Sequence, residues 1–148
     1  MRLLLSLLAL FPAACGGGSG VTPDPGPAQA IHDFMQAVAD SNLARMAQLW
    51  GTRSGPAATT RQPSDYQQRI QVMHAYLKGA TARVISQIEG SSDRTTLHVE
   101  MSRGGCVRNV PFVLVRLSGN RWIVMNVDIA AIGTPGRDCP MENRRPPG

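Results

Sequence analysis

The sequence predicts an α+β domain in which three N-terminal helices pack on a curved four-stranded antiparallel sheet. Two observations lead to this class. Apolar residues recur with helical spacing up to about residue 78, and from residue 81 onward they alternate with the period of strands. Helices that precede an antiparallel meander are typical of α+β domains. The 148 residues are enough for one such domain with its own core.

Three segments are predicted to be helices: 27–39, 43–50 and 64–78. In the first, apolar residues stand at i, i+3, i+4 and i+7, namely Ile31, Phe34, Met35 and Val38. Pro27 suits the first helical turn, and Gly79 is placed to end the third helix. The polar stretch 51–62, between the second and third helices, is expected to be a long loop.

The second half of the chain predicts four strands that form consecutive hairpins. The clearest alternation places Leu97, Val99 and Met101 on the buried side. Pro111 lacks a backbone N–H and should therefore lie at an edge or a bulge. The turn Ser118-Gly119-Asn120 is a hairpin signal. The expected strands are 81–89, 94–102, 107–117 and 121–132.

The first residues have the pattern of a signal peptide. Arg2 precedes the apolar run 3–11, which is too short for a stable transmembrane span, and small residues lead to Cys15. The "PAAC" stretch resembles the lipobox of bacterial lipoproteins, in which the cysteine is diacylated before cleavage. We therefore expect residues 1–14 to be removed and Cys15 to carry lipid. The alternative is an ordinary secretory leader, which would give a soluble secreted protein.

Both ends of the chain are expected to lie outside the fold. Residues 15–27 are rich in Gly, Ser and Pro and are expected to act as a tether. Residues 140–148 are polar and rich in Pro, and are expected to form a disordered tail. The domain is then 28–139. Gly16 is not Asp, which by resemblance to Gram-negative lipoproteins argues for the periplasmic side of the outer membrane.

Export makes disulfides possible, and two further cysteines are present, Cys106 and Cys139. The register of the predicted last hairpin places Ile132 opposite Cys106. The seven residues after Ile132 can turn back and bring Cys139 within reach. We expect these two cysteines to form a disulfide; the alternative is two free thiols.

The formal net charge is +5, but the arginines are dispersed along the chain. Because there is no basic run and no aromatic stacking platform, we expect no nucleic-acid binding. The three histidines, His32, His74 and His98, have no metal-ligand spacing. We therefore expect no metal and no cofactor.

The order of elements resembles the NTF2-like superfamily, which has a cystatin-like α+β cone. The likeness covers about 28–132 and is carried by "FMQAVADSNLARMAQLW" and by the last strand, "RWIVMNVDI". It implies a conical pocket between helices and sheet. Members use this pocket for ligand binding, for isomerase, dehydratase or epoxide-hydrolase chemistry, or not at all, and others dimerise through the sheet.

Four residues are candidates for lining such a pocket: Trp50, Tyr66, Asn126 and Asp128. The last two fall on the same face of the predicted strand 121–132. Asp128 is a weak candidate for a general base, as in isomerase-like members of the superfamily. The alternative, which alternation favours, is that Asn126 and Asp128 face solvent.

We therefore expect a non-catalytic domain held by lipid to the bacterial cell envelope, which binds a small apolar ligand or assembles as a homodimer. One alternative is a small isomerase or hydrolase of the NTF2-like type with Asp128 as base. The other is a soluble secreted binding module.

Overall fold

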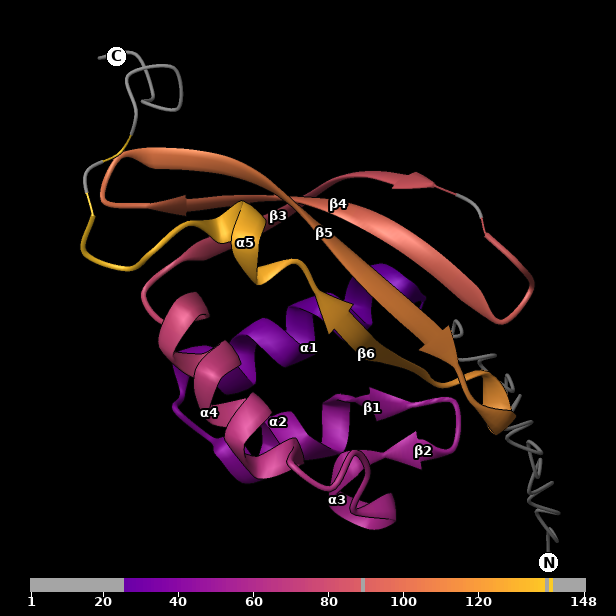
Figure 1. The fold of residues 1–148 in the computed structure, drawn as a ribbon. Helices are drawn as coiled ribbons and strands as arrows, with labels where there is room; N and C mark the ends of the chain where they lie inside the picture. Colours follow the sequence, from indigo (N-terminus) through magenta and orange to yellow (C-terminus); the bar gives the residue numbers. More distant parts are fainter. Residues whose placement is uncertain (1–25, 89, 138, 140–148) are drawn as a thin grey trace, which may run out of the picture.

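The computed structural model describes residues 26–88, 90–137 and 139. Figure 1 shows a curved sheet on one side of the molecule and helices on the other, so the predicted α+β class is confirmed. The helices are α1 (Pro27–Ala39), α2 (Leu43–Leu49), α3 (Ala57–Thr60), α4 (Tyr66–Leu77) and α5 (Ile129–Ile132). The strands are β1 (Gly51–Thr52), β2 (Gly55–Pro56), β3 (Thr81–Ile88), β4 (Arg94–Arg103), β5 (Cys106–Arg116) and β6 (Trp122–Val127), with a 3-10 turn, η1 (Ser118–Asn120), before β6.

The main sheet has the predicted meander, with strand order β3-β4-β5-β6 and antiparallel pairing throughout. The short pair β1–β2 forms its own hairpin and lies beside β6 in Figure 1. One parallel bridge, from Trp50 to Val124, joins this region to the sheet. Trp50 is therefore held between α2 and the last strand.

The core lies between the inner face of the sheet and α1. In the register of β4 and β5, Leu97 is opposite Phe112 and Val99 is opposite Val110, and all four side chains are buried. The predicted alternation of β4 is confirmed. The predicted apolar face of α1 is also buried, and Phe34 has no exposed surface.

The helices form two layers rather than one. α1 contacts β3, β4 and β6, whereas α4 packs against α1, α2 and α5. The three predicted helices occur in the predicted order along the chain. However, α1 makes most of the helix contacts with the inner face of the sheet. α4 faces the end of β6 across a cavity that residues of both elements line.

The stretch 51–62, expected to be a loop, contains β1, β2 and α3, so that prediction is wrong. Gly51 pairs with Pro56, and Thr52 pairs with Gly55. The close approach needs a glycine, because a Cβ at Gly51 would collide with the carbonyl oxygen of Gly55 and lie 2.9 Å from the backbone nitrogen of Ala57. Gly55 has a φ of 130°, which favours glycine.

The last predicted strand is too long. β6 ends at Val127, because the Asp128 carboxylate accepts a hydrogen bond from the backbone N–H of Ala131 at 3.1 Å and so caps α5. The register also shifts by one residue between Val113 and Leu114 of β5. Ile132 therefore does not pair with Cys106, although both residues line one cavity.

Pro111 lies in an inner strand, opposite His98 of β4. Its carbonyl oxygen accepts a hydrogen bond from the Asp128 N–H at 3.1 Å on the β6 side. The N–H and C=O of a strand residue point to the same side, so the missing donor of Pro111 faces the place where β6 has ended. Pro111 therefore lies in an inner strand, but its nitrogen faces a point where β6 no longer runs beside β5, so the expected edge position is met only locally.

β3 is the open edge of the sheet and is mostly exposed. Its pairing with β4 has a bulge between Val84 and Ser86. This irregularity breaks the expected alternation, in which Ile85 and Ile88 would face opposite sides. Both isoleucines are exposed, at 43% and 54%.

The predicted disulfide is confirmed. Cys106 and Cys139 are bonded, with their Cα atoms 5.5 Å apart. Cys106 begins β5 directly after the turn Gly104-Gly105, in which both residues have positive φ, 55° and 79°. The bond holds the segment after α5 against this turn.

The predictions for residues 1–14, 15–25 and 140–148 fall outside the described residues. Among the residues that are described, no helix has both the length and the apolar character needed to cross a membrane.

Candidate functional site

The structure brings two of the four predicted pocket residues together. Trp50 and Asn126 line a cavity of about 270 Å³ between the end of α2, α4 and the end of β6. Its remaining lining consists of Asp65, Gln68, Arg69, Val72, Met73, Val127 and Ile129. The lining is therefore mixed, and both α4 and β6 contribute polar as well as apolar side chains to it.

Trp50 is 5% exposed and belongs to the core. Its indole N–H is buried and has no acceptor among the described residues. A buried donor without a partner costs about 1–3 kcal/mol. Trp50 lines the cavity, but its Nε1 atom has almost no exposed surface, so a ligand acceptor reaches this donor only if a neighbouring side chain moves.

The polar side of this cavity carries an ion pair. Nε of Arg69 donates to Oδ1 of Asp65 at 2.9 Å, one helical turn away. This hydrogen bond holds the pKa of the Asp65 carboxyl below its ordinary value, and Asp65 raises the pKa of Arg69. Asp65 is therefore a carboxylate at neutral pH and is already engaged by Arg69.

Tyr66 does not share this cavity. It lines a different one, of about 470 Å³, between α2, α3 and α4, together with Ala47 and Ile70. Its hydroxyl accepts a hydrogen bond from the side chain of Gln67 at 3.4 Å. Although Tyr66 neighbours Asp65 in sequence, it starts α4 and lies on another side of that helix.

Asp128 is exposed and is not among the lining residues of the four cavities found in the described part of the chain. Its carboxylate caps α5 instead. The expectation that Asn126 and Asp128 share one strand face is wrong, because the strand ends between them. Asn126 is also exposed to solvent, although it borders the Trp50 cavity.

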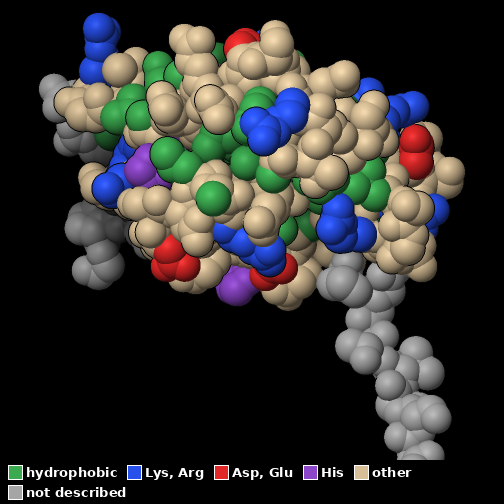
Figure 2. Space-filling model, turned by 90° about the horizontal axis from the view of Figure 1, so that it is seen from below, with side chains coloured by type: hydrophobic (Ala, Val, Ile, Leu, Met, Phe, Trp, Pro, Cys, Tyr) green, Lys and Arg blue, Asp and Glu red, His purple; other side chains and the backbone are tan. Residues whose placement is uncertain are grey.

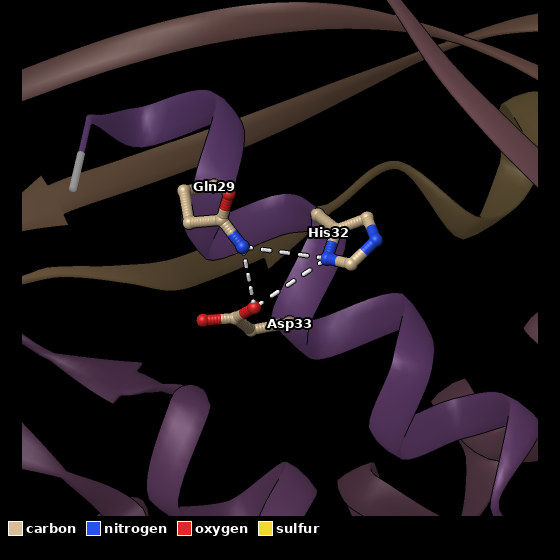
Figure 3. Close-up of polar contacts among 3 residues, drawn as sticks. All are labelled: Gln29, His32 and Asp33. Carbon is tan, nitrogen blue, oxygen red and sulfur yellow. Dashed lines mark hydrogen bonds and ion pairs between the residues drawn. The ribbon is translucent and has the colours of Figure 1, made fainter.

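The histidines lie on three different elements. His32 is on α1, where it contacts Asp33; Figure 3 shows these two side chains with Gln29, whose amide nitrogen donates to the same Asp33 oxygen at 2.8 Å. The His32 side chain is 71% exposed. His74 contacts Ser41, and His98 contacts Asn109. Within the described ranges, no three His, Cys, Asp or Glu side chains are grouped to hold a metal ion.

Two larger cavities were not anticipated from the sequence. One, of about 600 Å³, lies between α1, α2, α3 and the start of β6, and its lining includes Asp33, Arg45 and Arg121. The other, of about 580 Å³, lies beside the disulfide and is lined by Arg103, Arg108 and Arg137. Their residues come from segments far apart in the chain, so no local motif marks them.

Elsewhere the basic residues are dispersed. On the face seen in Figure 2, Lys and Arg side chains lie in separate groups, and some of these groups lie beside Asp or Glu side chains. Some arginines are paired with carboxylates, as Arg53 is with Asp93 and Arg83 is with Glu100.

Comparison with known proteins gives a distant likeness to a solved structure. No protein-family model matches the chain, and no curated protein matches it. Among solved structures, it is similar to an NTF2-like protein of unknown function from Cytophaga hutchinsonii, at 11% identity over 70% of this chain and 90% of that chain, with a TM-score of 0.40. The α+β architecture is consistent with the resemblance drawn from the sequence, and a likeness at this level says nothing about activity.

Proposed function

We propose that this chain is a lipid-anchored, non-catalytic binding domain of the bacterial cell envelope. In this proposal the Trp50 cavity takes a small, partly apolar ligand that carries a hydrogen-bond acceptor. The observation that carries the proposal is the buried indole N–H of Trp50, which has no acceptor among the described residues.

The lining of the cavity supports this choice of ligand. Val72, Met73 and Ile129 offer apolar contacts, and Asn126 and Gln68 add amide groups to the lining. Such cavities bind small molecules by apolar burial, with a few polar groups that set the orientation. Once a neighbouring side chain moves and opens Nε1, a carbonyl oxygen that accepts from Trp50 would remove the cost of the unpaired donor.

The envelope location rests on the leader and on the cysteines. Cys106 and Cys139 form a disulfide, which persists in exported proteins and is rare in the cytosol. Cys15, the third cysteine of the chain, follows the signal-peptide pattern. If Cys15 is acylated, each of the three cysteines has a role, because the other two form the disulfide.

The enzymatic alternative has less support. A general base must lie within reach of a proton on a bound substrate, and Asp128 is exposed and serves as the cap of α5. Asp65, the carboxylate at the Trp50 cavity, is engaged by Arg69. The homodimer remains a prediction without a contact in the structure to argue from.

Binding can be tested with small neutral carbonyl compounds, cyclohexanone and N-methylacetamide, by ligand-observed NMR on the full mature chain. We expect binding that weakens about fivefold to tenfold in Trp50→Phe, which keeps an aromatic ring, although a smaller one, and loses the N–H donor. Asp128→Asn is the matched control, because Asn also caps helices. Equal binding by wild type and Trp50→Phe would refute the assignment of this cavity.

Anchoring is tested separately by expressing the full chain in a bacterium and measuring the mass of its N-terminal peptide. A diacylated or triacylated Cys15 in the membrane fraction is the expected result. Cys15→Ser should then appear in the soluble fraction. An unmodified mature N-terminus beyond residue 15 would instead favour the soluble secreted alternative.

A further inference from the structure

Three arginines converge at the disulfide end of the sheet. Arg103 ends β4, Arg108 lies near the start of β5, and Arg137 follows α5; all three line the cavity of about 580 Å³ beside Cys106 and Cys139. The cavity floor includes Met101 and Ile132, which are buried apolar residues. The site therefore combines positive charge at its walls with an apolar base.

Arg103 is hydrogen-bonded to a backbone carbonyl, and Arg108 lies close to the backbone of Gly133. Nη1 of Arg103 donates to the carbonyl oxygen of Tyr76, near the end of α4, at 2.6 Å. The guanidinium of Arg108 lies against Gly133: a Cβ at Gly133 would stand 3.0 Å from its Cζ and 3.1 Å from its Nη2. Gly133 also has a φ of 75°, so a glycine leaves both the space and the backbone conformation that this arginine needs.

The positive charges of this cavity are not balanced within the described residues. Its lining contains no Asp or Glu, and none of the ion pairs found in the described ranges involves Arg103, Arg108 or Arg137. Asp138, which follows Arg137 in sequence, lies outside those ranges. Three guanidinium groups around one cavity repel one another, and a bound anion relieves this repulsion.

We propose that this cavity binds a small soluble organic anion through its carboxylate or phosphate group. A guanidinium presents its donors in a planar fork that matches the oxygens of such groups. The apolar part of the ligand would lie on Met101 and Ile132. This site is separate from the Trp50 cavity, so the inference does not depend on the function proposed above.

The disulfide positions one wall of the site. It joins the β4–β5 turn, which follows Arg103, to the segment that carries Arg137. Reduction would remove this covalent link between the β4–β5 turn and the segment that carries Arg137. Anion binding should therefore weaken on reduction even where the domain stays folded.

The test is a calorimetric titration of the full mature chain with benzoate and with phenyl phosphate. We expect Arg108→Gln and Arg137→Gln each to weaken binding about tenfold or more. Arg94→Gln is the matched control: it removes the same charge from an exposed residue at the opposite end of β4, and should leave affinity within about twofold. Raising the salt concentration should weaken wild-type binding.

Equal affinities of wild type, Arg108→Gln and Arg137→Gln would overturn the proposal, as would absence of binding by either anion. An equal loss in Arg94→Gln would also overturn it, because the effect would then come from net charge and not from this cavity. Since Arg137 is exposed, Arg137→Gln tests the site even if the replacement of Arg108 disturbs folding. Binding of neutral carbonyl compounds to the Trp50 cavity provides a separate readout in the same samples.

Discussion

The pair Asp65–Arg69 shows how a single surface contact depends on pH. Both side chains are largely exposed, and their hydrogen bond lies at the first turn of α4. The bond favours the charged carboxylate, which is why the pKa of Asp65 is lowered. A group whose pKa falls on folding stabilises the native state above its unfolded pKa, and this contribution is lost as the pH falls through the lowered folded value.

We therefore expect Asp65→Asn to lower the urea midpoint of unfolding slightly at pH 7. The difference from wild type should shrink as the pH falls below about 4, near the ordinary pKa of an aspartate. Urea unfolding of both proteins at pH 7, 5 and 3 measures this. A difference that stays constant down to pH 3 would show that the ion pair is not its cause.

Residues that lie where a strand ends and a helix begins were the hardest to assign from sequence. Asp128 alternates correctly with Asn126 for a strand, yet its short side chain bonds the N–H three residues later and starts a helix. The same letters, "DIAAI", fit both a strand and a capped turn of helix, because Ile and Ala are apolar in either. Only the end of β6 at Val127 distinguishes the two possibilities.

At the scale of elements, long periodic segments were predictable and short ones were not. α1 has its predicted bounds, because its apolar residues repeat over 13 positions. α3 has four residues and β1 has two, which is too short for any periodicity to show. These short elements depend on contacts with distant parts of the chain, such as the bridge between Trp50 and Val124.

The β1–β2 hairpin provides a test at this scale. We expect Gly51→Ala to destabilise the domain by about 1–3 kcal/mol, because the added methyl meets backbone atoms of Gly55 and Ala57 that cannot move independently. Gly26→Ala is the matched control, since a Cβ there has no atom within 4 Å, and it should stay within about 0.5 kcal/mol of wild type. Urea unfolding at pH 7 gives both values, and equal losses in the two variants would count against this account of the hairpin.

At the scale of the whole molecule, the meander order and the disulfide were predictable from the sequence, but the cavities were not. The order follows from the change of period near residue 80, and the disulfide follows from the cysteine count, although the predicted pairing of Ile132 with Cys106 is wrong. The arginine cavity joins residues 103, 108 and 137, which meet because the end of β4, the start of β5 and the segment after α5 lie together. No spacing within the sequence reports that meeting.

The disulfide closes a span of 33 residues. We expect the double variant Cys106→Ser, Cys139→Ser to lose about 3–4 kcal/mol of unfolding free energy, because the unfolded chain regains the freedom of that loop. Thermal and urea unfolding measure the loss, and reduction of the wild type should reproduce it. Cys15→Ser should leave the free energy of unfolding unchanged, so an equal loss in that variant would contradict this assignment of the cysteines.

The N-terminus of the domain and the arginine cavity lie at opposite ends of β5. The strand has 11 residues and so extends for roughly 35 Å. Near its last residues lies the first turn of α1, since Gln29 and Arg121 border one cavity there, and the chain enters the domain at this end (Figure 1). The arginines stand at the other end. A domain anchored through its N-terminus would therefore present the anion site on its far side, where a diffusing solute reaches it without competition from the anchor.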